Sequence, residues 1–120
     1  AMEFDDFRHI DLKYYLKPKQ KAEIILSENV SPDQVFAHIS ASLAANKNWK
    51  PRKSDSSDTL CFAVKSSYKS TDLVSIESTP DNRLLIISKP KGLIWLVDFG
   101  RNYLNVIKLI NIIKSLPAPR

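Results

Sequence analysis

Residues 59–89, TLCFAVKSSYKSTDLVSIESTPDNRLLIISK, contain three runs in which apolar and polar side chains alternate, and polar turns separate the runs. Successive side chains of a strand point to opposite faces, so this alternation is typical of strands that bury one face. Strands are therefore expected at 59–65, 72–79 and 83–89. The Pro-Asp-Asn sequence at 80–82 predicts a turn, and a link this short joins antiparallel strands.

A helix is expected before this segment. Residues 31–34, Ser-Pro-Asp-Gln, combine a capping serine, a proline that suits the first helical position and a glutamine that completes a capping box. The helix is expected to end near residue 46. Phe36, Ile39 and Leu43 recur at helical spacing, so they are expected to face the core.

The C-terminal segment 92–116 predicts a second helix. It begins with the apolar run 93–97, after which Asp98 is suited to cap a helix and Gly100 would let that helix approach the sheet closely. Charged residues interrupt the segment, so it is not expected to span a bilayer and must pack against the sheet, a partner or a membrane surface. The helix has a wide apolar face, which Leu104 widens further. Its polar strip consists of Arg101, Asn105, Lys108 and Ser115.

The predicted order of elements is strand, helix, four strands, helix, with the first strand at 23–27 and the second opening at Trp49. An antiparallel sheet with two helices packed on one face satisfies this order, so the expected fold class is α+β, in the order β-α-β4-α. The opposite face of the sheet is then left open. Either the N-terminal arm covers that face or it forms an exposed apolar floor, and an exposed patch of more than roughly a few hundred Å² usually marks a binding site. The residues expected there are Leu73, Leu85, Ile87, Cys61 and Ala63.

The chain has 120 residues and a formal net charge of +5, from 18 Lys and Arg against 13 Asp and Glu. We expect a single α+β domain at 22–117, preceded by an N-terminal arm at 1–21. The arm is either flexible or a short strand at the domain edge, and residues 1–4 resemble a cloning remnant. No signal peptide is expected, because the first residues are acidic. The positive charge permits contact with nucleic acid, anionic lipid or an acidic protein.

The residue types that carry catalysis and metal binding are scarce. The single cysteine, Cys61, excludes an internal disulfide and a cysteine-based zinc site, and it is expected to be a packed thiol in a strand. Of the two histidines, His38 is expected on the solvent face of the first helix. Two glycines cannot build a phosphate-binding loop, and the sequence has no nucleophile elbow. We therefore expect a protein that is not an enzyme and that needs no metal or cofactor.

Residues 98–102, Asp-Phe-Gly-Arg-Asn, are followed by an apolar helix and resemble the Asp-Leu-Gly-x-Asn signature of the uncharacterised family called domain of unknown function 1499. The residues that match the signature are Asp98, Gly100 and Asn102. The helix opening at 31–36 is also similar to that of the family, and the resemblance covers residues 22–116.

This resemblance implies an intracellular setting, in the bacterial cytoplasm or a plastid, and it implies no enzymatic activity. The family is similar in element order to one half of the TATA-binding protein and, more loosely, to helix-grip lipid-binding domains. The sequence departs from the family at 88–92, where Ser-Lys-Pro-Lys-Gly stands in place of a serine- and arginine-rich strand.

Two groups of residues are candidates for binding. The first is a basic patch, which would neutralise phosphates and make binding salt-dependent. It consists of Lys47, Lys50, Arg52, Lys53, Lys65 and Lys69. The second joins the open sheet face to the apolar run, where basic residues beside Trp95 form an interfacial anchor suited to an anionic membrane. It consists of Leu85, Ile87, Lys89, Lys91, Leu93 and Trp95.

The run 93–97 could instead be a buried strand or a link that crosses the core. We expect a non-enzymatic binding module that contacts a protein partner or an anionic membrane surface through the open sheet face and the loop around Trp95. One alternative is nucleic-acid binding through the basic patch and the sheet. Another is a small apolar ligand or lipid held between the sheet and the last helix.

Overall fold

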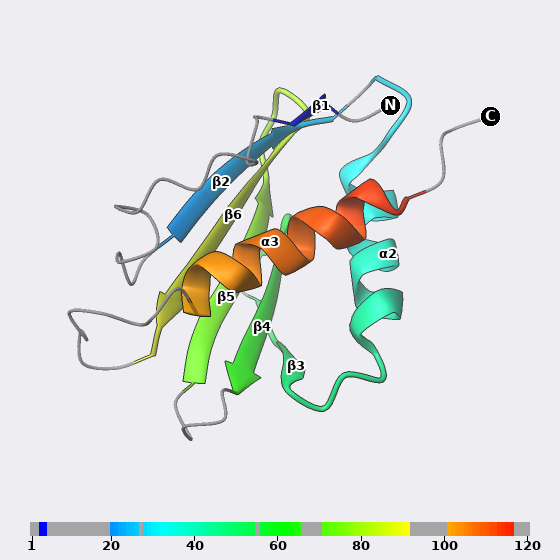
Figure 1. Ribbon diagram of the computed structural model, residues 1–120. Helices are drawn as coiled ribbons and strands as arrows, with labels where there is room; N and C mark the ends of the chain where they lie inside the picture. Colours follow the sequence, from blue (N-terminus) through cyan, green and yellow to red (C-terminus); the bar gives the residue numbers. More distant parts are fainter. Residues whose placement is uncertain are drawn as a thin grey trace.

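The computed structural model describes residues 3–4, 20–26, 28–54, 56–65, 71–91 and 101–116. These residues form an antiparallel sheet with the strand order β1-β2-β6-β5-β4-β3, and two helices pack on one of its faces (Figure 1). The strands are β1 (Glu3–Phe4), β2 (Gln20–Ile25), β3 (Trp49–Arg52), β4 (Thr59–Lys65), β5 (Thr71–Ser78) and β6 (Arg83–Pro90). The helices are α2 (Pro32–Leu43) and α3 (Arg101–Lys114).

The strand order follows from how the chain connects the strands. Strands β3 to β6 pair in sequence order as an antiparallel meander, and α2 carries the chain from β2 to the far edge of the sheet at β3. Strand β2 is therefore left to pair with β6, the last strand of the meander. The predicted α+β class, an antiparallel sheet with two helices on one face, is confirmed.

Several element boundaries differ from the expected ones by one to three residues. Strand β4 spans Thr59–Lys65 as predicted, whereas β2 begins three residues earlier than expected, at Gln20. Helix α2 ends at Leu43 rather than near residue 46, because Asn46 ends the helix with a turn. The Asn46 backbone N–H donates to Leu43, and its side-chain oxygen accepts from the Asn48 backbone N–H at 3.0 Å.

The capping box at the start of α2 forms as predicted. The Ser31 hydroxyl accepts a hydrogen bond from the Gln34 backbone N–H at 3.2 Å, and the Gln34 side chain accepts one from the Ser31 N–H at 2.9 Å. A capping side chain of this kind stabilises a helix by about 1 kcal/mol. Val35, Ile39 and Leu43 are buried, while Phe36 packs partly buried against the core.

One face of the sheet and both helices share a single hydrophobic core. Alternate residues of each central strand are buried in it, as the alternation predicted, and Ile24, Ile76 and Ile86 have no exposed surface. At the β3 edge, Trp49 and Phe62 meet edge to face with ring centroids 5.7 Å apart. The residues that alternate with the buried ones along each strand, such as Cys61 and Leu73, therefore point to the opposite face.

The predicted turn at 80–82 joins β5 to β6. Asn82 adopts a φ of 60°, a left-handed conformation that asparagine tolerates better than most residues. Its side-chain amide donates to the carbonyl of Leu26 at 3.4 Å, and its own carbonyl accepts from the Leu26 N–H at 3.0 Å. The turn residue thus fixes the hairpin to the segment that leaves β2.

Helix α3 differs from the expectation in which side chains it buries. Leu104, expected to widen the apolar face, is 60% exposed, whereas Asn105, expected on the polar strip, is 7% exposed. The first turns of α3 pack against a buried carboxylate, Asp72, so that part of the helix presents amides to the sheet instead of aliphatic side chains. Among the described residues, no helix is long and apolar enough to cross a bilayer.

Candidate binding surface on the open sheet face

The face of the sheet that points away from the helices carries ordered rows of side chains. Strand register places Arg52 of β3 opposite Cys61, Cys61 opposite Ser75, Ser75 opposite Ile87, and Ile87 opposite Lys21 of β2. Directly opposed residues on one face of a sheet have neighbouring side chains. This row therefore has a cation at each end and small or apolar groups between them.

The next row repeats the pattern. Lys50 lies opposite Ala63, Ala63 opposite Leu73, and Leu73 opposite Lys89. Ala63 and Leu73 are partly buried, while both lysines are exposed. Two adjacent rows thus place an apolar floor between two sets of exposed cations.

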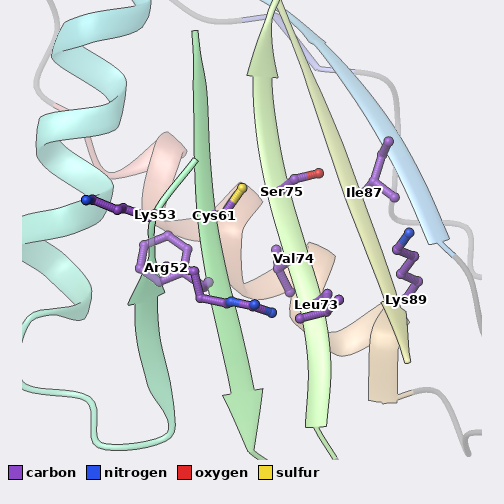
Figure 2. Close-up of a pocket in the computed structure, with 9 residues that line it drawn as sticks. Arg52, Lys53, Cys61, Leu73, Val74, Ser75, Ile87 and Lys89 are labelled. Carbon is purple, nitrogen blue, oxygen red and sulfur yellow. The ribbon is translucent and has the colours of Figure 1, made fainter. Parts of the chain in front are cut away.

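A hollow of about 300 Å³ lies on this floor. Figure 2 shows that the Arg52 side chain extends across β4 toward β5, while Ile87 and Lys89 lie on β6 at the other side. A volume of this size is near the lower end of ligand-binding pockets. The residues whose side chains line the hollow from this face are Arg52, Cys61, Leu73, Ser75, Ile87 and Lys89, and Lys53 borders it with its side chain directed away (Figure 2).

Positive charge is concentrated at one end of the sheet, where β3 and β5 begin and β4 and β6 end. Within the part of the chain that the structure describes, none of the cations at this end forms an ion pair on the open face. Unpaired like charges of this density create a local positive potential that attracts anions. The cations at this end are Lys21, Lys47, Lys50, Lys65, Lys89 and Lys91, while Arg52 lies at the other end of β3 and Lys53 follows it.

The opposite end of the same face has carboxylates and internal ion pairs. Arg83 contacts Glu23 at 2.5 Å and Asp81 at 2.9 Å. A hydrogen bond from the Thr79 hydroxyl, and to a lesser extent the Arg83 charge, lowers the pKa of Asp81. Glu77 lies in the same region. The open face is therefore divided into a basic end and a mixed, acidic end.

The structure brings residues from both predicted groups into the same hollow. Arg52 and Lys53 come from the predicted basic patch, and Ile87 and Lys89 from the predicted contact surface. Leu85 lies on the same face but beside Glu23 and Glu77, outside the hollow. Lys47, Lys50, Lys65 and Lys91 lie at the basic end without lining the hollow, and Lys69, Leu93, Trp95, Asp98 and Gly100 are outside the described residues.

Asn102, the described residue of the predicted family motif, lies on the other side of the sheet in a buried polar cluster. Asp72 is fully buried and accepts hydrogen bonds from Arg101 Nε at 2.8 Å and Nη2 at 2.9 Å. Asn105 donates to the same carboxylate at 3.1 Å. Burying a carboxylate is tolerated when hydrogen bonds and a cation compensate it, and this cluster supplies both.

Ser88 completes the cluster from β6. Its hydroxyl donates to the Asn102 side-chain oxygen at 2.6 Å and accepts from Asn105 at 3.2 Å, while the Asn102 amide lies 3.4 Å from Asp72. These contacts fix the first turns of α3 to β5 and β6. We therefore interpret the cluster as a structural element that positions α3.

The sequence pattern offered a signal for this cluster. Asp72 has the same parity as Val74 and Ile76, so the alternation places its carboxylate on the core face, where it requires a partner. Arg101 and Asn105 are four residues apart and lie on one side of a helix. The combination of a carboxylate on a core face and a helix with a polar first turn therefore predicts this contact.

His38 and Cys61 lie on opposite sides of the sheet. His38 was expected on the solvent face of α2, but it is partly buried and its Nε2 atom contacts the Ile112 carbonyl at 3.0 Å and the Ser115 hydroxyl at 2.8 Å. It therefore connects α2 to the end of α3. Cys61 is a partly exposed thiol in the floor of the hollow. No group of His, Cys, Asp and Glu suited to hold a metal ion occurs among the described residues.

No protein-family model matches this chain, and comparison with curated proteins gives no match. The resemblance of residues 22–116 to domain of unknown function 1499 therefore stays a prediction. We therefore base the proposed function on the geometry of the open face.

Proposed function

We propose that this chain is a non-enzymatic binding domain that holds an acidic protein partner on the open face of its sheet. The observation that supports this function is the hollow of about 300 Å³, whose apolar floor of Leu73 and Ile87 is bordered by Arg52 on β3 and Lys89 on β6. A partner that brings carboxylates to the cations and an apolar side chain to the floor would complement both features. Apolar contact would supply affinity, and charge would supply specificity and fast association.

The face is better suited to this contact than the sheet edge. At the β3 edge, the strand consists of Trp49, Lys50, Pro51 and Arg52, and it pairs with β4 along its other side. Proline donates no backbone hydrogen bond, and lysine or arginine on a short edge strand discourages the addition of another strand. A partner is therefore expected to contact side chains on the face.

Nucleic acid is a weaker match for this surface. Sequence-tolerant binding to single strands relies on aromatic side chains that stack on bases. Among the described residues, the aromatic side chains of β3 and β4, Trp49 and Phe62, point into the core, so they are not available to bases on the open face.

Membrane binding and an internal lipid also receive less support. A membrane anchor uses apolar side chains that protrude into the bilayer, whereas Leu73 and Ile87 are partly buried in a hollow. The layer between the sheet and α3 is filled by side chains without exposed surface, including Ile86, Leu109 and Ile113. The open face therefore offers the better place for a ligand.

The architecture within the α+β class is part of the same proposal. The strand order β2-β6-β5-β4-β3, with both helices on one face, supports a similarity to one half of the TATA-binding protein or, more loosely, to a helix-grip domain. Likeness of fold does not establish function. It supports only the use, for contact, of the sheet face on which none of the described helices packs.

The test compares three anionic probes at low and moderate salt: a fluorescein-labelled peptide of repeated Glu-Ser-Leu-Ser units, phosphatidylcholine vesicles with and without phosphatidylglycerol, and single- and double-stranded DNA. We expect the peptide to bind, and Lys89→Glu to weaken its binding about tenfold or more. The matched control is Lys108→Glu, which makes the same charge change on an exposed residue of α3 and should leave binding nearly unchanged.

Three results would overturn the proposed function. Binding to phosphatidylglycerol vesicles without binding to the peptide would make this a membrane-surface domain. Tighter binding to DNA, with a steep loss of affinity as salt rises, would make it a nucleic-acid-binding domain. Equal effects of Lys89→Glu and Lys108→Glu on peptide binding would show that net charge, and not the hollow, holds the peptide.

A further inference from the structure

The two sets of cations beside the hollow lie at a spacing that selects among acidic partners. Arg52 is on β3 and Lys89 on β6, which are three strand spacings apart, roughly 14 Å at about 4.8 Å each. The side chain of Arg52 extends across β4 toward β5 (Figure 2), so its charged group lies closer to β6 than the strand spacing alone implies. Anionic groups that contact both cations are therefore separated by at most roughly this distance.

An extended peptide meets this requirement over five residues. At about 3.3 Å per residue, the first and fifth residues of a strand are roughly 13 Å apart, and their side chains point to the same side. The third residue also points to that side and lies midway between them. In a helix, the first and fifth residues share one side but the third points to the opposite side, so the apolar side chain could not reach the floor together with both carboxylates.

We infer that the hollow binds an extended acidic segment in which an apolar residue is flanked, two positions away on each side, by Asp or Glu. This inference rests on the proposed function and specifies the partner. The central apolar side chain occupies the floor formed by Cys61, Leu73 and Ile87, and the two carboxylates contact Arg52 on one side and Lys89 on the other. The segment crosses the strands and does not extend the sheet.

The dimensions and polarity of the hollow fit this occupant. A volume of about 300 Å³ is roughly ten times the share of one water molecule, enough for an aliphatic or aromatic side chain. Ser75 adds a hydroxyl to the floor, which can donate to or accept from the peptide backbone. The basic end of the open face holds no described carboxylate that would repel the segment, because Asp72 is buried on the other face with Arg101.

The test uses three fluorescein-labelled seven-residue peptides and fluorescence anisotropy. The first has leucine at its centre, glutamate two positions away on each side, and serine or glycine elsewhere. The second has the same composition, with the two glutamates adjacent to one another. The third replaces leucine by serine. We expect the first peptide to bind about tenfold more tightly than each of the others.

Variants of the chain test whether residues of the hollow cause this preference. Arg52→Gln and Lys89→Gln should each reduce the advantage of the first peptide over the second to less than about twofold, since one carboxylate then loses its partner. Lys108→Gln on α3 is the matched control and should keep the full advantage. Thermal unfolding of each variant shows whether it is folded as the wild type is.

The outcomes separate the inference from the proposed function. If both glutamate–leucine peptides bind equally and both lose affinity in Lys89→Gln, the spacing inference is wrong and the acidic-partner function stands. A preference for the first peptide that persists in both Arg52→Gln and Lys89→Gln also overturns the inference. If no acidic peptide binds to the folded protein, the proposed function fails together with the inference.

Discussion

The two faces of the sheet differ in whether their charged side chains are paired, and the difference appears between consecutive residues of one strand. Asp72 and Leu73 are consecutive on β5, yet Asp72 is sealed on the helix face by Arg101 and Asn105, while Leu73 forms part of the open floor. On β6, Ser88 bonds to Asn102 in the core and Lys89 lines the hollow. On the helix face, polar groups bind one another and hold the fold together. On the open face, the described cations of the basic end form no ion pair with a described neighbour, and we propose that they bind an acidic partner.

The largest expected effect comes from Asp72. Replacing Asp72 by Ala removes the buried carboxylate to which Arg101 and Asn105 donate hydrogen bonds, and with it the ion pair to the largely buried Arg101 guanidinium. We expect the free energy of unfolding to fall by about 3 kcal/mol, measured by urea denaturation. Leu73→Ala, one residue away on the open face, should cost about 1 kcal/mol. Equal losses of unfolding free energy at the two positions would contradict the proposed difference between the two faces.

A smaller contrast is expected on β6. Ser88→Ala leaves the buried Asn102 and Asn105 amides with one partner fewer and should cost about 1–2 kcal/mol of stability, without changing affinity for an acidic peptide. Lys89→Ala should change stability by less than about 0.5 kcal/mol but weaken peptide binding severalfold. Denaturation and anisotropy on the same two proteins measure both quantities. The comparison fails if Ser88→Ala weakens binding as much as Lys89→Ala does.

Salt is expected to weaken peptide binding on the open face much more than it lowers the stability of the fold. Exposed cations on the open face are screened by ions, whereas the buried contact between Asp72 and Arg101 is screened much less. Raising the ionic strength from low to physiological is therefore expected to lower peptide affinity severalfold and to leave the free energy of unfolding nearly constant. The salt dependence of binding should be shallower in Arg52→Gln than in the wild type. A parallel loss of stability and affinity would contradict this assignment.

The smallest expected effect is a loss of stability at high pH that depends on the buried Tyr103 of α3. Burial raises the pKa of Tyr103 above its usual value of 10.0. As pH rises above 10, tyrosine in the unfolded chain loses its proton before Tyr103 in the folded chain does, so stability falls between the two pKa values. Tyr103→Phe should remove part of this decline. Chemical denaturation measures the stability of variant and wild type at each pH. Identical pH profiles of stability would show that Tyr103 is not shielded from water.

Much of this fold could be predicted from local patterns. Alternation located β4, β5 and β6 to within a residue, and the Ser-Pro-Asp-Gln sequence located the start of α2. The end of α2 was missed because Asn46 forms a turn with Leu43 and Asn48, and asparagine signals a helix end less clearly than glycine does. The cost of burying Asp72 explains why Asn105 is buried although it was expected on the polar strip of the last helix.

The candidate site was predictable only in parts, because strand register decides which residues are neighbours. Lys89 and Ile87 were assigned to one predicted surface and Arg52 and Lys53 to another, since they are separated by more than thirty positions in the sequence. Pairing of β3 with β4, β4 with β5, and β5 with β6 places them around one hollow. Local patterns assign each residue to a face, and only the register shows which residues share a row.

The most direct test of the open face as a binding surface uses the single cysteine of the chain. Cys61 is a partly exposed thiol in the floor of the hollow, so its rate of reaction with a thiol reagent reports whether the floor is covered. We expect the glutamate–leucine–glutamate peptide to slow this reaction in a saturable manner, with the same midpoint as its binding measured by anisotropy. An unchanged reaction rate at peptide concentrations that saturate binding would place the ligand elsewhere and contradict the account.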